Sequence, residues 1–269
     1  MKPEIVSQEK LFNLVEIMGT RFFWPADYDT KGLASVYRDV FAPFEINPHA
    51  YESNKTRVLE NEWLIDAGAC EGFFSQYALS RGANVLLIEP VKKLVEALSL
   101  TYENEIKQGK IQILHGALGP ENGTIDISIP DGGPIVASID PCWTISKDWE
   151  FYEPDLGMTA KEKVQLFTID EIVRQGIIPR VDYIKMDIEN AEVGAILGAE
   201  KTLCSMKPKL SIAVYHDYYN ARHIHSYIKK FNHNMLSIIV VYSTDPAMGH
   251  RDLSCCMGGH KSRWIFSRN

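Results

Sequence analysis

Short apolar runs alternate with segments of helical spacing along most of the chain. Residues 63–66 form the first run and precede a helical pattern over 73–79. Residues 84–89 form the second run, which a helical segment follows from 91 to about 104, and residues 111–115 form the third. A rhythm of strand and helix at these lengths predicts a parallel sheet with right-handed crossovers.

The same rhythm returns in the second half of the chain. Apolar runs predict strands at 181–187, 210–214, 235–242 and 263–266. Helical spacing predicts helices between them, at 191–202 and 220–231. The chain is therefore predicted to be an α/β protein with a mostly parallel sheet.

The first 60 residues do not follow this rhythm. Four apolar residues fall at helical spacing there: Leu11, Leu14, Val15 and Met18. Pro25, Pro43 and Pro48 would interrupt a long helix, so two or three short helices are predicted. We expect an N-terminal helical arm at 1–60 and a main domain at 61–269. The arm either covers a ligand cleft or packs against the main domain without a role in binding.

A second departure from the rhythm covers residues 120–163. Residues 125–129 alternate between apolar and polar, which is typical of a strand or hairpin insertion. Four aromatic residues follow in a predicted loop: Trp143, Trp149, Phe151 and Tyr152. They could form the wall of a substrate site or the loop's own small core. Residues 164–167 then predict a short strand, and the capping box Thr168-Ile169-Asp170-Glu171 predicts the start of a helix.

Composition and charge narrow the class of protein. The 269 residues are 45% hydrophobic and 23% charged, as in a soluble globule, and the net charge of −7 argues against a general nucleic-acid binder. The apolar runs are too short to span a bilayer, and the N-terminus lacks the apolar core of a signal peptide. The five cysteines form no CxxC pair, which favours reduced thiols over a zinc site. We expect a cytoplasmic protein without nucleic-acid or membrane partners, and its oligomeric state stays open.

The turn after the first strand carries the candidate chemistry. Asp66 closes that strand, and Gly68 and Gly72 follow it in the pattern Asp-x-Gly-x-x-x-Gly. Gly68 allows a tight turn, Gly72 allows close approach of a ligand, and the next helix N-terminus would face an anionic group. Glu89 ends the second strand, where a carboxylate can accept hydrogen bonds from both hydroxyls of a ribose.

This pattern differs from the Gly-x-Gly-x-x-Gly of a dinucleotide-binding fold. A small zwitterionic nucleoside without a pyrophosphate fits it better than NAD does. Two alternatives stay open at this point: an NAD(P)-dependent oxidoreductase, and an ordinary strand–turn–helix unit that binds no ligand.

Several motifs occur together in the order found in one known family. They are Asp66-Ala67-Gly68-Ala69-Cys70-Glu71-Gly72, Glu89-Pro90, Ala117-Leu118-Gly119 and Lys185-Met186-Asp187-Ile188-Glu189-Asn190-Ala191-Glu192. With the insertion after Gly119 and the helix start at Thr168, they resemble the FkbM family of S-adenosylmethionine (SAM)-dependent methyltransferases over about residues 60–230. The resemblance implies a Rossmann-like class I methyltransferase sheet of seven strands. It also implies O-methylation, often of sugars or secondary metabolites.

Two positions depart from the family pattern. The family's usual Asn in the turn after the first strand is Cys70 here. Its usual Gly after the acid Glu189, which follows the strand predicted at 181–187, is Asn190. Cys70 is expected to change little, because the backbone holds the turn. Asn190 tolerates a positive φ better than most residues, so the backbone is expected to be kept.

Ligands of open α/β sheets lie outside the carboxyl ends of the strands, which assigns the cofactor site. The amino-acid part of SAM is expected among Asp66, Gly68, Ala69, Cys70, Gly72 and Ser75. Glu89 is expected to hold the ribose. The adenine is expected near His115, Gly116 and Ala117.

The catalytic residues are expected at the ends of the strands predicted at 181–187 and 210–214. Asp187, Glu189 and His216 come together there. Methyl transfer displaces an already activated leaving group, so the protein mainly aligns the acceptor and removes its proton. His216 is the first candidate for this base and Asp187 the second. His216 could equally cap its strand through a hydrogen bond.

The same side chains could instead bind a metal ion. Asp187, Glu189 and His216, with Asp217 beside them, offer oxygen ligands and one imidazole, which suit Mg²⁺ or Mn²⁺. A metal there would lower the pKa of an acceptor hydroxyl. Salt bridges from Lys185 or Arg222 would explain the same acids without a metal.

Taken together, the sequence predicts a SAM-dependent O-methyltransferase that acts on a small molecule, with Mg²⁺ as a candidate second cofactor. A methyltransferase-like binding protein without turnover is the non-enzyme alternative.

Overall fold

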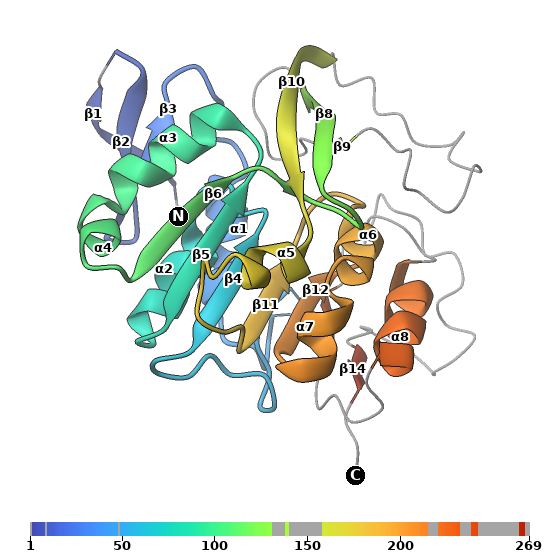
Figure 1. The fold of residues 1–269 in the computed structure, drawn as a ribbon. Helices are drawn as coiled ribbons and strands as arrows, with labels where there is room; N and C mark the ends of the chain where they lie inside the picture. Colours follow the sequence, from blue (N-terminus) through green and yellow to red (C-terminus); the bar gives the residue numbers. More distant parts are fainter. Residues whose placement is uncertain are drawn as a thin grey trace, which may run out of the picture.

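The structure is a computed structural model that describes residues 2–8, 10–47, 49–130, 138–139, 158–214, 220–231, 238–241 and 264–266. A sheet in the order β14-β13-β12-β11-β4-β5-β6 forms its centre (Figure 1). Its strands are β4 Trp63–Ala67, β5 Asn84–Glu89, β6 Ile111–His115, β11 Tyr183–Met186, β12 Lys209–Ala213, β13 Ile238–Val241 and β14 Trp264–Phe266. Neighbouring strands are parallel except for the pair β13 and β14. The predicted α/β class and mostly parallel sheet are therefore confirmed.

Helices cover both faces of the sheet, because alternate residues of a strand point to opposite sides. Leu64 of β4 shares an apolar cluster with residues of α2 and α3, whereas Ile65 shares one with residues of α5, α6, α7 and α8. The first face carries α2 Phe73–Ser80 and α3 Lys92–Thr101, and α4 Glu103–Lys107 follows α3. The second carries α5 Ile169–Arg174, α6 Glu192–Leu197, α7 Glu200–Ser205 and α8 Asn220–Phe231.

The helix predicted over 191–202 is two helices, α6 and α7, with Gly198 between them. The chain passes very close to another turn at this point, since a Cβ atom on Gly198 would lie 2.2 Å from the carbonyl oxygen of Gly119. The predicted capping box is present in α5, where the backbone N–H of Glu171 donates to the Thr168 hydroxyl at 3.0 Å.

The N-terminal segment differs from the prediction. The helix expected over residues 11–18 is absent from the described chain, and a three-stranded antiparallel sheet takes its place. The strands are β1 Glu4–Gln8, β2 Phe12–Ile17 and β3 Thr20–Pro25. In β2 the side chains of Asn13, Val15 and Ile17 are buried, so the real period is two. One helix of the predicted arm does form, α1 Leu33–Phe41, and it ends before Pro43.

The physical reason for the difference lies in the turn between β2 and β3. Met18 and Gly19 have φ angles of 51° and 82°, and two positive φ angles are what a tight hairpin turn needs to match strand twist. Helical spacing of Leu11, Leu14 and Met18 concealed this hairpin, because Leu14 is only half-buried and Leu11 and Met18 are exposed. The domain boundary near residue 60 stays a prediction.

The N-terminal sheet and α1 are packed onto the main domain. Phe22 and Trp24 of β3 and Leu33 of α1 share one apolar cluster with Phe73 of α2 and Leu94 of α3. The rings of Phe22 and Phe73 pack in a T-shaped arrangement, with 4.9 Å between the ring centroids. The arm is therefore continuous with the core beside the carboxyl edge of the sheet.

The insertion between β6 and β11 forms a second sheet in the order β7-β10-β8-β9. Its strands are β7 Ala117–Leu118, β8 Gly123–Pro130, β9 Ser138–Ile139 and β10 Met158–Phe167. The strand predicted at 125–129 lies within β8, and the short strand predicted at 164–167 is the end of the longer β10. The two run antiparallel as a ribbon that projects beside the main sheet (Figure 1). Trp143, Trp149, Phe151 and Tyr152 lie outside the described residues.

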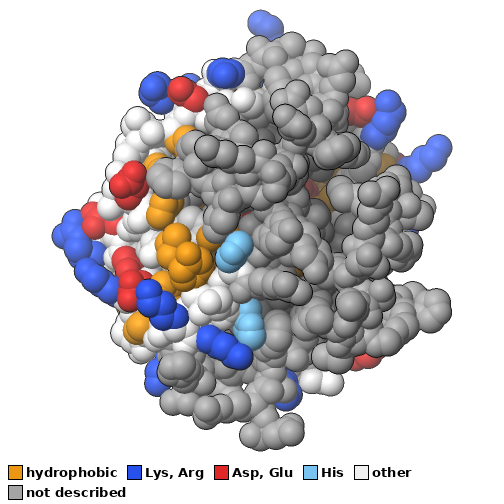
Figure 2. Space-filling model, turned by 90° about the vertical axis from the view of Figure 1, so that its right-hand side faces the viewer, with side chains coloured by type: hydrophobic (Ala, Val, Ile, Leu, Met, Phe, Trp, Pro, Cys, Tyr) orange, Lys and Arg blue, Asp and Glu red, His pale blue; other side chains and the backbone are white. Residues whose placement is uncertain are grey.

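Figure 2 looks onto the side of the molecule that carries α8. Lys and Arg side chains edge the described part of this face, and hydrophobic side chains gather in one area beside the atoms drawn in grey. Within the described ranges, no helix has the length and apolar character needed to cross a membrane.

Gly68 and Gly109 provide a matched test of the close approach between the turn after β4 and the end of β11. Both have a φ near +70°, but a Cβ atom on Gly68 would lie 1.9 Å from the Asp187 carbonyl oxygen, and one on Gly109 would meet nothing within 4 Å. We expect Gly109→Ala to cost about 1–2 kcal/mol of unfolding free energy. Gly68→Ala should cost roughly 3–5 kcal/mol, because overpacking adds to the strained φ. Urea denaturation measures both, and equal losses would contradict the close approach.

Candidate functional site

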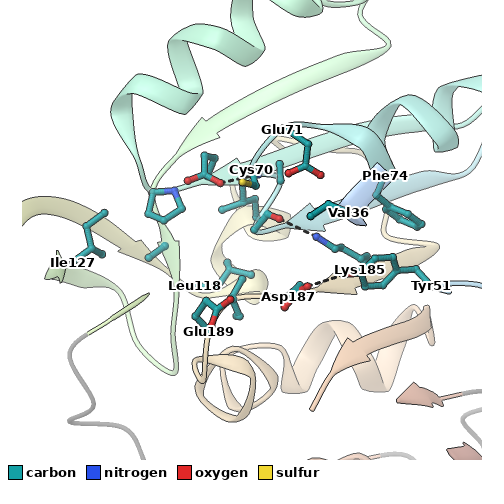
Figure 3. Close-up of a pocket in the computed structure, with 18 of the residues that line it drawn as sticks. Val36, Tyr51, Cys70, Glu71, Phe74, Leu118, Ile127, Lys185, Asp187 and Glu189 are labelled. Carbon is teal, nitrogen blue, oxygen red and sulfur yellow. Dashed lines mark hydrogen bonds between the residues drawn. The ribbon is translucent and has the colours of Figure 1, made fainter. Parts of the chain in front are cut away.

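A pocket lies at the carboxyl edge of the central sheet, where β4, β5 and β11 end. The chain runs from β4 outward through β5 and β6, and then returns to the other side of β4 at β11. Such a reversal of strand order is where open α/β sheets bind ligands. The turn after β4, the ends of β5 and β11, and residues of α1 and β8 line this pocket (Figure 3).

The turn after β4 is held against the end of β5 by its backbone. The N–H of Gly68 donates to the carbonyl oxygen of Ile88 at 3.0 Å, and the N–H of Cys70 donates to Oε2 of Glu89 at 2.9 Å. Cys70 itself has a φ of 47°. Gly68, Ala69 and Cys70 all line the pocket, so this part of the predicted cofactor set is brought together.

Glu89 lies in the pocket wall with its carboxylate fixed by two backbone donors. Its Oε2 accepts from Cys70, and its Oε1 accepts from the N–H of Val91 at 2.9 Å. Only 3% of the residue is exposed. Burial raises the pKa of Glu89 to about 7, against the lowering effect of the two hydrogen bonds. Each carboxylate oxygen keeps a second lone pair, which a ligand hydroxyl can use.

Glu71 is a second buried acid of the pocket, and the sequence motif alone indicates no role for its side chain. It is 8% exposed and lines the pocket beside Cys70. Burial raises the pKa of Glu71 to about 7. Burial also raises the pKa of the Cys70 thiol, and Glu71 and Glu89 raise it further, so this cysteine is held in its unreactive form.

Asp66 and Lys185 form a buried ion pair, in which Lys185 lines the pocket and Asp66 does not. Nζ of Lys185 lies 3.0 Å from Oδ1 of Asp66 and donates to the carbonyl oxygen of Gly68 at 2.8 Å. The hydroxyl of Ser75 donates to Oδ2 of Asp66 at 2.7 Å. Burial lowers the pKa of Lys185, but the charges of Asp66 and Asp187 outweigh it and leave the pKa raised.

Three of the residues predicted around the amino-acid part of SAM lie outside the pocket lining. Asp66 and Ser75 are fully buried and bonded to each other. Gly72 precedes α2, and a Cβ atom there would lie 2.8 Å from the hydroxyl of Tyr102, which donates to the Gly72 carbonyl oxygen at 2.6 Å. Direct contact of these three with a cofactor stays a prediction, and the structure gives each of them a packing role.

Of the residues predicted near the adenine, two line the pocket and one does not. Gly116 and Ala117 line the pocket, together with the apolar side chains of Leu118 and Ile127. His115 is exposed, and its Nε2 lies 3.0 Å from the carbonyl oxygen of Pro90. The ring of His115 is thus bonded to the chain after β5 and does not line the pocket.

Asp187 and Glu189, which follow β11 in the chain, both line the pocket. The Tyr51 hydroxyl donates to Oδ2 of Asp187 at 2.6 Å, and the Tyr51 ring lies 5.2 Å from Nζ of Lys185 (Figure 3). Asn190 has a φ of 78°, so it keeps the left-handed backbone expected of the family's glycine. Tyr51 had no local signal in the sequence, because it meets Asp187 only through the fold.

His216 and Asp217 lie outside the described residues, and so does the side chain of Arg222. Within the described residues, no group of three His, Cys, Asp or Glu side chains is placed to hold a metal ion. The metal site and the base role of His216 therefore stay predictions. Lys185 pairs with Asp66, and it also acts on Asp187 through its charge.

A pocket at the switch point of a mostly parallel sheet is the place where α/β proteins of this class bind their ligands. A family model described as "Methyltransferase FkbM domain" matches residues 66–236. The chain belongs to this family of methyltransferases, as the sequence motifs predicted. The family model thereby confirms the predicted resemblance to the FkbM family.

A solved structure, the methyltransferase FkbM from Methylobacillus flagellatus KT, is similar to the chain. The sequences are 20% identical, the TM-score is 0.49, and the match covers 76% of this chain and 43% of that one. The chain thus spans less than half the length of that protein. No curated protein sequence matches the chain.

The buried ion pair can be tested by a double-mutant cycle. Lys185→Met leaves the Asp66 carboxylate buried without a cation, so the free energy of unfolding should fall by about 3–5 kcal/mol. Adding Asp66→Asn removes the buried charge and should recover part of this loss. Urea denaturation of the wild type, both single variants and the double variant gives the coupling energy. Strictly additive losses would show that the two side chains do not interact.

The buried acid Glu71 predicts a pH-dependent stability. Its pKa is about 7 in the folded protein against an ordinary 4.5, so the folded state binds more protons than the unfolded state between these values. The destabilising effect of Glu71 therefore grows as the pH rises through this window. We expect Glu71→Gln to raise the unfolding free energy by roughly 2–4 kcal/mol at pH 8 and to change it little at pH 4.5.

Thermal or urea denaturation at the two pH values measures this difference. Glu103→Gln is the control, because Glu103 is exposed and already paired with Lys107 at 2.5 Å. A Glu71→Gln effect that is the same at both pH values would contradict the burial of a charged carboxylate.

Proposed function

We propose that this protein uses SAM to methylate a hydroxyl oxygen of a small molecule, such as a sugar or a secondary metabolite. The observation that carries the proposal is the buried carboxylate of Glu89 at the end of β5. Its plane is fixed by two backbone N–H groups, in the pocket of a member of a methyltransferase family. A carboxylate there can accept hydrogen bonds from both ribose hydroxyls of a nucleoside.

The pocket also suits the two other parts of such a ligand. Gly116, Ala117, Leu118 and Ile127 give part of the pocket small or apolar walls, which fit a flat base. The pocket is lined by four acids, Glu71, Glu89, Asp187 and Glu189, and by one base, Lys185, whose charge is balanced by Asp66 outside the lining. The acids therefore give the pocket a negative character. SAM carries a positive sulfonium, so an acidic pocket is complementary to it.

When bound, SAM would supply a methyl group on a positively charged leaving group, ready for in-line displacement. The chain's own residues then have to place the acceptor and take its proton. Asp187 lies at the end of β11 with its orientation fixed by the Tyr51 hydroxyl at 2.6 Å. We assign Asp187 and Glu189 to the acceptor side, with His216 as the first candidate for the base and Asp187 as the second.

The two alternatives are distinguishable. An NAD(P)-dependent oxidoreductase is disfavoured by the family assignment and by the Asp-x-Gly-x-x-x-Gly turn. A methyltransferase-like binding protein would bind SAM and S-adenosylhomocysteine but transfer no methyl group. Transfer of radiolabelled methyl from SAM to a panel of hydroxylated small molecules separates this alternative from the enzyme.

Isothermal titration calorimetry tests the cofactor directly. We expect the protein to bind SAM and S-adenosylhomocysteine with dissociation constants of about 1–100 μM, and to bind NAD more than about a hundredfold more weakly. Glu89→Gln should weaken both adenosyl ligands by about tenfold or more, because a charge-assisted hydrogen bond to the ribose is lost. Glu103→Gln serves as the surface control. Tight NAD binding without SAM binding would overturn the proposal.

A further inference from the structure

Glu71 is a buried acid that forms no salt bridge with any of the described residues, although the charge of Lys185 acts on it. Its carboxyl group lies in the pocket wall between Cys70 and Phe74 (Figure 3). Lys185, a buried cation of the same pocket, pairs with Asp66 at 3.0 Å. Within the described residues, the hydrogen bonds to Glu71 come from the Cys70 thiol and from its own backbone N–H.

A carboxylate in such a place lowers the stability of the folded protein. Burial removes the solvation of the charged form, and the nearby charge of Asp66 adds to the effect. A glutamine of the same shape could hydrogen-bond there without the charge. A buried charge that costs stability and lines a ligand pocket is typical of a residue kept for binding.

The position of Glu71 along the pocket indicates which part of a ligand it would meet. Ile127 lies at one end, Glu71, Phe74 and Tyr51 lie toward the other, and Leu118 lies between them beside Glu189 (Figure 3). Glu89 is close enough to Glu71 for the charges to interact. A nucleoside with its base against Ile127 and its ribose on Glu89 would extend its 5′ substituent toward Glu71.

We propose that Glu71 binds the α-ammonium group at the amino-acid end of the cofactor. This inference rests on the proposed function, because it assumes an adenosyl ligand with an amino-acid substituent. An ammonium group offers N–H donors that a carboxylate can accept, whereas a sulfonium offers none. The sulfonium methyl has to face the acceptor, on the side of Asp187 and Glu189. Glu71 therefore recognises the end of the cofactor that does not react.

The experiment compares three ligands by isothermal titration calorimetry on the full chain at pH 8. SAM carries both the ammonium and the sulfonium, S-adenosylhomocysteine carries only the ammonium, and 5′-methylthioadenosine carries neither. We expect Glu71→Gln to weaken SAM and S-adenosylhomocysteine by about tenfold or more, and 5′-methylthioadenosine by less than about twofold. Glu71→Asp, which keeps the charge, should weaken the first two less than Glu71→Gln does.

Glu89→Gln is the matched comparison, because it removes one carboxylate charge from the same pocket. It should weaken all three ligands, since all three contain the ribose. Unchanged binding of 5′-methylthioadenosine by Glu71→Gln also shows that the variant pocket is folded.

Each other outcome overturns the inference in a distinct way. Loss of SAM binding alone would place Glu71 against the sulfonium, and equal loss of all three ligands would make its role structural. Unchanged binding of all three would mean that Glu71 does not meet the cofactor. If the wild type binds none of them, the proposed function fails and the inference fails with it. Wild-type binding with an insensitive Glu71→Gln overturns the inference alone.

Discussion

The carboxyl ends of β4 and β11 approach each other more closely than ordinary side chains would allow, and the site depends on that approach. Gly68 leaves the space that the Asp187 backbone occupies. Lys185 of β11 crosses to β4, where it neutralises Asp66 and donates to the Gly68 carbonyl oxygen. A buried charge without a partner would be costly, so the ion pair fixes the relative position of the two strand ends. The turn that carries Cys70 and Glu71 can then lie directly beside Asp187.

Some residues around the pocket stabilise the turn after β4, and others place charged groups in the pocket. Asp66, Ser75 and Gly72, which the sequence predicts as ligand contacts, stabilise the turn between β4 and α2 through hydrogen bonds and close packing. The acids Glu71 and Glu89 face the pocket and are poorly solvated, so their pKa values rise to about 7. A positively charged ligand would stabilise their ionised forms. The pocket is thus better suited to a cation than to a nucleotide phosphate.

The sequence predicted the main sheet well, because each strand and helix there carries its own local signal. Strand β5 and the α5 capping box are examples, since period, length and cap all agree. The prediction was wrong for β2, where apolar spacing fitted a helix and only the hairpin with β3 decides between the two periods. Tyr51 had no signal at all, because its partner Asp187 is 136 positions away. Glu71 is part of the sequence motif, but its burial, which gives it a distinctive environment, appears only in the folded structure.

The pairing of β4 with β11 has a consequence for how the molecule assembles. Leu64 and Ile65 of β4 pair with Tyr183 and Ile184 of β11. The two strands can therefore pair only when the loop of more than a hundred residues between them has closed. Contacts of such long range form late and slowly. A chain emerging from the ribosome would complete the β4–β5 unit long before it could shape the turn at Gly68. Ligand-binding competence should therefore appear in one late step of folding, after the emergence of β11.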